Sequence, residues 1–241
     1  MAVWAIADLH LSFGVEDKKM DVFGENWRDH PEKIKKNWER LVKDDDLVLL
    51  AGDISWAINL EQVLPDLTWI DSLPGTKVMI RGNHDYWWSS LSKVEKILPP
   101  SIHVIQNNTY NWNGISIGGA RMWDTAEYQF KEYIYTVPND RVKPLTAKDK
   151  DPARAEELFL RELARLEMSL KQLDPKGSLR IVMTHYPPIG MDLAPSRISA
   201  LLEQYKVDIC VFGHLHNFHR NILDPFGEKN GIRYVYTAAD Y

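Results

Sequence analysis

Residues 47–53 read Leu-Val-Leu-Leu-Ala-Gly-Asp, an apolar run of strand length that stops at a glycine and an acid. Four further runs share this character, at residues 3–7, 77–80, 179–184 and 208–212. Short runs that are rich in Val and Ile and almost continuously apolar are typical of strands buried on both faces. The sequence therefore predicts a buried strand at each of these places.

Helical patterns lie between the runs. Pro31 suits the first position of a helix, and the apolar residues after it are spaced to line one face: Ile34, Trp38, Leu41 and Val42. Residues 60–73 and 89–98 are shorter candidates, and Asp151-Pro152 is a cap for a helix that runs to about Leu173. Alternation of strands with helices predicts an α/β layered fold.

Two features interrupt this alternation. Residues 102–105, 109–112, 114–119, 219–223 and 233–238 are strand-like, and they predict a second set of strands with an antiparallel tendency. Residues 122–150 mix aromatic and charged side chains without regular spacing, so we expect a lid-like insertion or a surface excursion that packs its own aromatic residues. The whole chain, residues 1–241, is expected to be a single domain.

Composition limits the classes of function. The chain has 29 Lys and Arg against 34 Asp and Glu, a formal net charge of −5. Neutralising the phosphates of nucleic acid needs an excess of basic residues, so we do not expect nucleic acid as a partner. Cys210 lies in an apolar run and is expected in the core, which suits a reducing compartment. No signal peptide or membrane span is apparent, so we expect a cytoplasmic protein; the oligomeric state stays open.

Polar residues appear where the predicted strands stop. Since the carboxyl ends of strands border the ligand crevice of an α/β sheet, these segments should converge on one rim. Imidazole and carboxylate groups without thiolates are the donor set of a divalent transition metal. The residues concerned are Asp8, His10, Asp53, Asn83, His84, Asp85, His185, His214 and His216.

This ordered set resembles the calcineurin-like metallophosphoesterase superfamily. The resemblance implies a four-layer α/β-β/α sandwich of two mixed sheets flanked by helices, with two divalent metal ions at the strand ends. It also implies a role for each residue. Asp8, His10 and His216 would hold the first metal, and Asn83, His185 and His214 the second. Asp53 would bridge both, and His84 would stand beside the leaving group. The blocks that carry the resemblance are Asp8-x-His10, Gly52-Asp53, Gly82-Asn83-His84-Asp85, His185 and Gly213-His214-x-His216.

The two-metal centre that the resemblance implies would account for hydrolysis of a phosphate ester. Two dications about 3.5–4 Å apart can share a hydroxide that forms near neutral pH and attacks phosphorus, and they stabilise charge on the phosphoryl oxygens. An imidazole that binds no metal, here His84, can protonate the departing alkoxide. We therefore expect in-line hydrolysis of a phosphate mono- or diester of a small soluble substrate, with Asp53 and His84 as catalytic residues. The ligands suit Mn, Fe, Zn or Ni, and Mn or Fe is favoured.

Two details of the sequence argue against particular branches of this superfamily. The Ser/Thr protein phosphatase branch extends its second block to Gly-Asp-x-Val-Asp-Arg-Gly, whereas residues 52–56 read Gly-Asp-Ile-Ser-Trp. Protein phosphatase activity is therefore not expected, and the residue that orients His84 is left open. Residues 7–11, Ala-Asp-Leu-His-Leu, are also similar to lipid-processing UDP-diacylglucosamine pyrophosphohydrolases, but the sequence has no apolar cap for a two-chain lipid.

Few residues can be assigned to the substrate. Asn83 is one candidate, and Arg121 is another because a guanidinium group matches a phosphate or carboxylate, although a surface salt bridge would explain it equally well. For Trp56, Trp87 and Trp88, which follow the metal-binding blocks, we prefer core packing to stacking on a substrate. Structural roles are expected for Arg81 and for the remaining histidines His30, His103 and His219.

Two other classes of function stay open beside a small-molecule phosphohydrolase. One is a nuclease or nucleotide pyrophosphohydrolase, which would want a basic channel, but basic and acidic residues balance within residues 122–150. The other is a catalytically inactive scaffold of the same fold. Retention of His84 beside a full ligand set argues against a scaffold, because a scaffold needs neither. The sequence does not separate monoester from diester hydrolysis.

Overall fold

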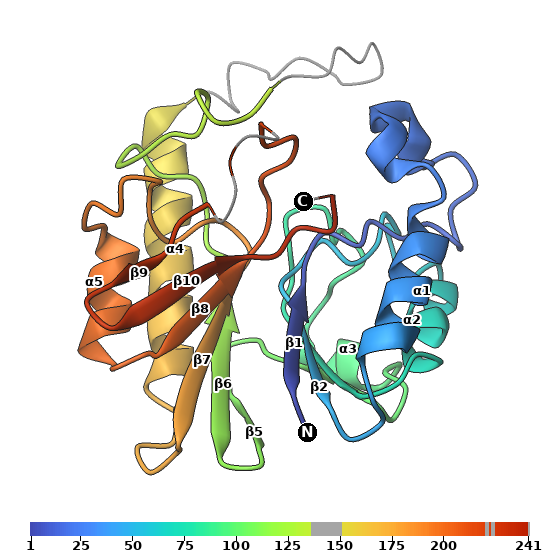
Figure 1. The fold of residues 1–241 in the computed structure, drawn as a ribbon, viewed down its shortest axis with the longest axis horizontal. Helices are drawn as coiled ribbons and strands as arrows, with labels where there is room; N and C mark the ends of the chain where they lie inside the picture. The colour runs from blue at the N-terminus through green and yellow to red at the C-terminus, as the bar shows by residue number, and fades with distance from the viewer. Residues whose placement is uncertain (136–150, 220–221, 223–224, 241) are drawn as a thin grey trace.

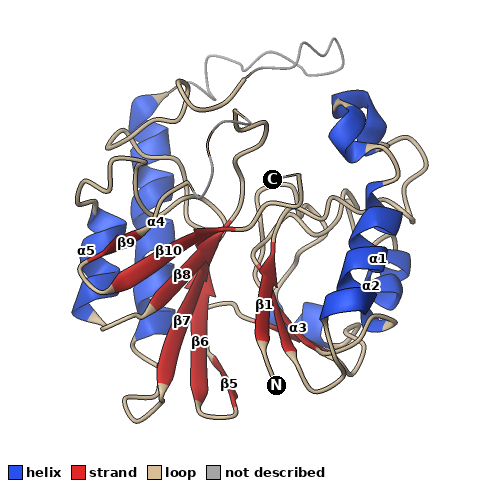
Figure 2. Ribbon diagram, in the orientation of Figure 1, coloured by secondary structure: helices blue, strands red, loops and turns tan. Residues whose placement is uncertain are grey.

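Two β-sheets lie face to face in the centre of the molecule, and helices cover the outer face of each sheet (Figure 1). The computed structural model describes residues 1–135, 151–219, 222 and 225–240. The layers therefore run helix, sheet, sheet, helix, as the family resemblance implies (Figure 2). No helix of the described chain is both long and apolar enough to span a membrane.

The first sheet has four parallel strands in the order β1-β2-β3-β4. Residues 102–105, which we expected in the second set of strands, contribute β4 and pair with β3 instead. The strands are β1 (Val3–Ile6), β2 (Leu47–Leu50), β3 (Thr76–Met79) and β4 (Ile102–Val104), and the helices packed on this sheet are α1 (His30–Leu41), α2 (Leu64–Asp71) and α3 (Leu91–Glu95). Two short 3-10 helices, η1 (Met20–Phe23) and η2 (Glu25–Trp27), precede α1.

The second sheet has six strands in the order β5-β6-β7-β8-β10-β9. Its four central strands are parallel and only the two edge strands are antiparallel, so the expected antiparallel tendency is wrong for most of the sheet. The strands are β5 (Tyr110–Trp112), β6 (Ile115–Ala120), β7 (Leu179–Thr184), β8 (Ile209–Phe212), β9 (Glu228–Lys229) and β10 (Ile232–Tyr236); the helices are α4 (Pro152–Leu170) and α5 (Arg197–Gln204).

Alternate residues of the central strands supply two different cores. Leu47 and Leu49 of β2 point into the core between the sheets, whereas Val48 and Leu50 pack toward the helices on the first sheet. Successive side chains of a strand face opposite sides of its sheet, so a strand between two apolar layers must be apolar at every position. This is the physical reason for the continuous runs in the sequence.

Some segments depart from the sequence-based expectation. His219 and Ile222 lie in no strand, and the other members of the expected strand 219–223 are outside the described residues. Helix α5 was not expected from the sequence; it begins at a capping box in which Ser196 and Ser199 exchange hydrogen bonds. Residues 122–135 form no helix or strand beyond an isolated bridge of Ile134 to Phe218, and residues 136–150 are not described.

Candidate metal centre

The parallel strands of both sheets end at one edge of the molecule, uppermost in Figure 1. The structure brings all seven predicted ligand residues together at this edge, on the loops that follow five strands. Asp8 and His10 follow β1, Asp53 follows β2, Asn83 follows β3, His185 follows β7, and His214 and His216 follow β8.

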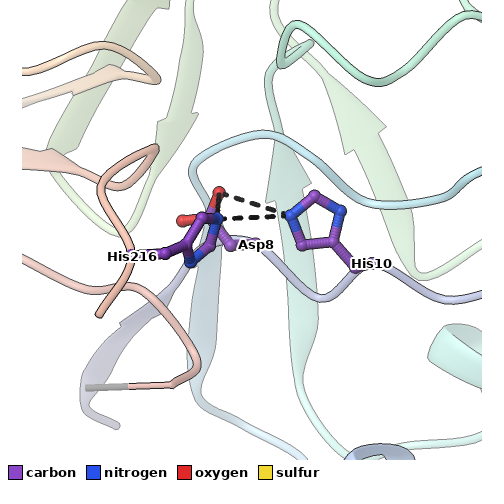
Figure 3. Close-up of side chains that lie close together, drawn as sticks. All are labelled: Asp8, His10 and His216. Carbon is purple, nitrogen blue, oxygen red and sulfur yellow. Dashed lines mark hydrogen bonds and ion pairs between the residues drawn. The ribbon is translucent and has the colours of Figure 1, made fainter. Parts of the chain in front are cut away.

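Asp8, His10 and His216 form one group of donors. Figure 3 shows both imidazoles turned toward the Asp8 carboxylate, although His216 comes from the far end of the chain. His10 Nε2 lies 3.4 Å from His216 Nε2 and 4.0 Å from Asp8 Oδ1, and His216 Nε2 lies 3.7 Å from the same oxygen. Separations of this size leave room for one cation between the three side chains.

Asn83, His185 and His214 form a second group. The side-chain oxygen of Asn83 lies 2.7 Å from His185 Nε2 and 3.0 Å from His214 Nδ1. His185 donates its other ring hydrogen, on Nδ1, to the carbonyl of Ala51, which turns Nε2 toward the group.

Asp53 lies between the two groups. Its Oδ2 atom is 3.7 Å from His10 Nε2 and 3.3 Å from His185 Nε2. Its Oδ1 atom accepts a hydrogen bond from the backbone N–H of His84 at 2.8 Å. The carboxylate is therefore fixed where it can contact cations in both groups.

The backbone at the centre adopts conformations that its sequence would not suggest. Asp8, His10, Asp53 and His214 have φ values of +60°, +45°, +53° and +72°, in the left-handed region that non-glycine residues rarely occupy. Each such residue costs on the order of 1–3 kcal/mol, and this strain is found at functional sites. Gly213 allows a close approach, because a Cβ there would overlap Asp8 Oδ2.

The electrostatic environment favours positive charge. Burial lowers the pKa of His10 and of His214 well below its ordinary value, so both are neutral and able to ligate. Burial acts in the same direction on His185 and His216, but nearby carboxylates outweigh it and raise the pKa of each to about 9, chiefly Asp53 for His185 and Asp8 for His216. The carboxylates therefore create a site where a cation is stabilised.

These residues fit divalent cations. Asp8 is fully buried, and its Oδ2 atom accepts the backbone N–H of His214, but its Oδ1 atom has no hydrogen-bond partner among the described residues. A buried carboxylate oxygen without a partner is costly unless something binds it. A cation between Asp8, His10 and His216 would satisfy that oxygen with the imidazole and carboxylate donors that transition metals prefer.

Asp240, which is not among the residues predicted from the sequence, supports His216. Its Oδ1 atom lies 2.8 Å from His216 Nδ1, and its Oδ2 atom accepts the backbone N–H of Asn217 at 3.2 Å. The Asp240 side chain is 2% exposed. A carboxylate on the far ring nitrogen fixes the orientation of a ligating histidine and makes it more basic. Its position shortly after a strand, as for the other polar residues, was the available signal.

Asp85 does not orient His84. Its carboxylate points the other way and accepts hydrogen bonds from the backbone N–H groups of Ile54, Ser55 and Gly82 and from Trp87 Nε1. Burial raises its pKa to about 6. Asp85 thus holds together the loops that carry Asp53 and Asn83.

The surroundings of His84 are aromatic. Its ring centroid lies 4.5 Å from that of Trp56 and 5.7 Å from that of His10, and its Nδ1 atom is 3.4 Å from the Tyr86 hydroxyl. Burial lowers the pKa of His84. Trp56 therefore lines the centre, against our preference for core packing, whereas Trp87 and Trp88 are buried in the core as expected.

The residues expected to be structural behave differently from one another. The His30 ring contacts two backbone carbonyls, His103 stacks on Tyr110, and the backbone N–H of His219 donates to Tyr133. Cys210 is buried in the core. Arg81, in contrast, makes no hydrogen bond or ion pair with any described residue.

The Arg121 side chain contacts none of the seven ligand side chains, but its backbone adjoins the centre. Its guanidinium is 3.0 Å from Glu162 Oε1 and lies over the Trp123 ring, 4.7 Å from the centroid, and its side chain is 12% exposed. Its carbonyl accepts the backbone N–H groups of His185 and Tyr186. The ion pair is thus largely buried and not the surface salt bridge we had considered.

A pocket of about 300 Å³ opens beside His214. Tyr186 and His214 both line this pocket, and their ring centroids lie 3.9 Å apart. Most of the remaining lining comes from the loop after β6, and it includes the aromatic residues Trp123, Tyr128 and Phe130.

Comparisons with known proteins agree with this geometry. A family model described as calcineurin-like phosphoesterase matches residues 1–218. The Gene 66 proteins of Mycobacterium phages L5 and D29 are 33% and 35% identical over 84 and 83 residues, about 34% of this chain. The matched segment spans about 40% of those relatives. The crystal structure of phosphopantetheinyl hydrolase from Mycobacterium tuberculosis is similar at 17% identity and a TM-score of 0.51, over 98% of this chain and 88% of that one.

Proposed function

Since this chain belongs to the calcineurin-like phosphoesterase family, we propose that it is a metal-dependent hydrolase of phosphoric esters, which uses two cations to hydrolyse a mono- or diester of a small substrate. The position of Asp53 carries the proposal. Its Oδ2 atom lies within 3.7 Å of His10 Nε2 and within 3.3 Å of His185 Nε2, so one carboxylate can serve both donor groups.

The donors divide into two sets. Asp8, His10 and His216 would hold one cation, and Asn83, His185 and His214 the other, with Asp53 shared between them. Two divalent cations at these positions would activate water near neutral pH and neutralise charge on the phosphoryl oxygens. Mn or Fe is the favoured metal for this donor set.

His84 would donate a proton to the leaving group. Its backbone is tied to Asp53, and its half-buried ring stands beside His10 and Trp56 without belonging to either donor set. Burial lowers its pKa, but the negative charge of a bound phosphate ester would raise that pKa and favour the protonated imidazole. The Tyr86 hydroxyl, near His84 Nδ1, is the candidate that orients the ring.

The pocket beside His214 supports a small organic group on the phosphate. With about 300 Å³ and aromatic walls from Trp123, Tyr128 and Phe130, it would accept a compact, partly apolar alcohol. A large lipid would not fit in a pocket of this volume. The cytoplasmic location and the lid-like role of residues 122–150 remain predictions.

Metal reconstitution tests the proposal. Protein stripped with a chelator should regain hydrolysis of p-nitrophenyl phosphate or bis(p-nitrophenyl) phosphate when Mn²⁺ or Fe²⁺ is returned, with two ions bound per chain by elemental analysis. The ratio of the two rates decides between monoester and diester. Wild-type protein that binds fewer than two ions and stays inactive with Mn²⁺, Fe²⁺, Zn²⁺ and Co²⁺ would contradict it.

Two variants separate metal binding from chemistry. Asp53→Asn should lower the bound metal below two ions and abolish turnover, because the shared carboxylate is lost. His84→Ala should keep two ions and lower kcat by roughly 10²–10⁴-fold, the usual contribution of a proton donor. His103→Ala is the matched control, because it removes a histidine of β4 that belongs to neither donor group. It should change neither the number of bound ions nor kcat.

A further inference from the structure

A smaller and more polar pocket, of about 90 Å³, lies at the same end of the sheets as the pocket beside His214. None of the seven metal donors lines it. Arg81 comes from the loop after β3, Arg121 from the loop after β6, and Arg165 from α4. The pocket adjoins the centre through the backbone, because Arg81 directly precedes Gly82-Asn83 and the Arg121 carbonyl binds the N–H of His185. Its polar lining consists of Arg81, Gln106, Asn107, Arg121, Glu162 and Arg165.

The lining has more positive than negative charge. Glu162 is the one acidic side chain in it, and its Oε1 atom is shared by Arg121 at 3.0 Å, Arg165 at 2.7 Å and Arg161 at 3.5 Å. The other acid whose charge acts on Arg81 is Asp85, and both of its oxygens accept N–H groups already. Among the described residues, neither carboxylate forms an ion pair with Arg81.

The Arg81 side chain makes no hydrogen bond or ion pair with any residue that the structure describes. Its Nε atom is buried, as is that of Arg121, and neither atom has a hydrogen-bond partner among the described residues. Arg81 and Arg121 line the same pocket, so they bring two like charges to it. Buried charges are ordinarily paired, so an anion in this pocket would supply a partner for the Arg81 guanidinium and for the Nε atom that Arg121 leaves unpaired beside its ion pair with Glu162.

We propose that the pocket between Arg81, Arg121 and Arg165 binds an oxyanion, a phosphate or carboxylate group. Guanidinium groups match both anions with paired hydrogen bonds. Gln106 supports this chemistry: its side-chain oxygen accepts Trp88 Nε1, and its NH₂ group has no partner among the described residues. The oxyanion is either a second anionic group of the substrate or a free ion; only the first source rests on the proposed function.

Inorganic phosphate is the first probe. Titrated into chelator-treated protein, it should raise the unfolding midpoint and bind with a calorimetric Kd that Arg81→Gln and Arg165→Gln weaken by about tenfold each. Arg81→Lys keeps the positive charge but loses the planar guanidinium that can donate two parallel hydrogen bonds to one anion. Its Kd for phosphate should therefore lie between the Kd of wild type and that of Arg81→Gln. Arg154→Gln, an exposed arginine at the start of the same α4, is the matched control and should bind as wild type does.

Arg165 is 43% exposed, so its variant keeps the test available even if Arg81→Gln fails to fold. Circular dichroism of each variant without phosphate establishes which of them are folded. Equal affinity of wild type, Arg81→Lys and Arg165→Gln for phosphate would overturn the proposal. This titration needs no turnover, so it can succeed even if the metal-reconstituted protein hydrolyses nothing.

A second arm identifies the source of the oxyanion. With metal-loaded enzyme, ω-carboxyalkyl phosphates of increasing chain length are compared with the matching alkyl phosphates. A lower KM for one carboxylated length, lost in Arg81→Gln but kept in Arg154→Gln, assigns the pocket to the substrate. Equal KM values together with Arg81-dependent phosphate binding assign it to a free oxyanion. Absence of both effects contradicts the proposal.

Discussion

Asp240 shows how a single residue can complete the centre from far away in the sequence. It contacts both the His216 ring and the backbone of Asn217, and it lies beyond residue 218, where the match to the family model ends. A buried carboxylate on the non-ligating nitrogen restricts the imidazole to one orientation. The orientation of His216 therefore depends on the C-terminal segment of the chain.

Replacing Asp240 by Asn should weaken metal binding. Loss of the carboxylate makes His216 less basic and less well oriented, so the affinity for Mn²⁺ should fall by about 10–100-fold. Calorimetric titration of chelator-treated protein measures this change. The exposed Asp17→Asn variant removes one acid elsewhere and should leave the affinity unchanged. An Asp240→Asn protein with wild-type affinity would show that the contact does not position His216.

At the scale of elements, two buried acids fix the loop after β2. Asp85 binds it to the loop after β3 through the backbone of Ile54 and Ser55. Asp66 of α2 binds it from the other side, by accepting the Ser55 hydroxyl and the backbone N–H of Phe13. The loop that carries Asp53 is therefore held between a neighbouring loop and a helix.

Asp66 should make stability depend on pH. Burial raises its pKa from 3.8 to about 6, so the folded protein holds this proton more tightly than the unfolded chain does. Its contribution to the free energy of unfolding should fall as pH rises from about 4 to about 6, by at most about 1.4 kcal/mol per pH unit. Urea unfolding of chelator-treated protein measures this slope.

The variant Asp66→Asn isolates the effect, because the other buried carboxyl groups are common to both proteins. Its unfolding free energy should fall less steeply than that of wild type between pH 4 and pH 6. Asp17→Asn, again the exposed control, should keep the wild-type slope. Identical slopes for wild type and Asp66→Asn would contradict the prediction.

At the scale of the whole molecule, the centre joins the two sheets. Asp8, His10, Asp53 and Asn83 follow strands of the first sheet, whereas His185, His214 and His216 follow strands of the second. Each proposed cation would therefore contact residues from both sheets. The apolar core between the sheets also holds them together, as do backbone hydrogen bonds of Ala7, after β1, with Thr237 and Ala239, after β10.

Metal binding should consequently stabilise the fold. A ligand that binds only the folded state adds about 2.7 kcal/mol at a concentration 100 times its Kd, so the unfolding midpoint should rise with Mn²⁺ in scanning calorimetry. Asp53→Asn should show a smaller rise, because it weakens both donor sets. A midpoint that does not move at saturating Mn²⁺ would refute the link between the centre and the stability of the two-sheet fold.

The sequence predicted the parts of this protein that depend on local pattern. The five apolar runs became β1, β2, β3, β7 and β8, since burial on both faces requires apolar residues at every position. Family resemblance added a role for each polar residue at their ends. In contrast, the sheet to which residues 102–105 belong is decided by pairing with β3, which no local pattern encodes.

By itself, then, the sequence determined the layered α/β fold and the residues that gather at its strand ends, because apolar periodicity and residue type are local properties. Only the tertiary structure decided the partners of those residues. Asp240 reaches His216, Asp85 faces two loops instead of His84, and the buried Nε atom of Arg81 has no hydrogen-bond partner in the described part of the chain. These relations arise when distant segments are packed into one core, where each buried polar group must find a partner in space rather than along the chain.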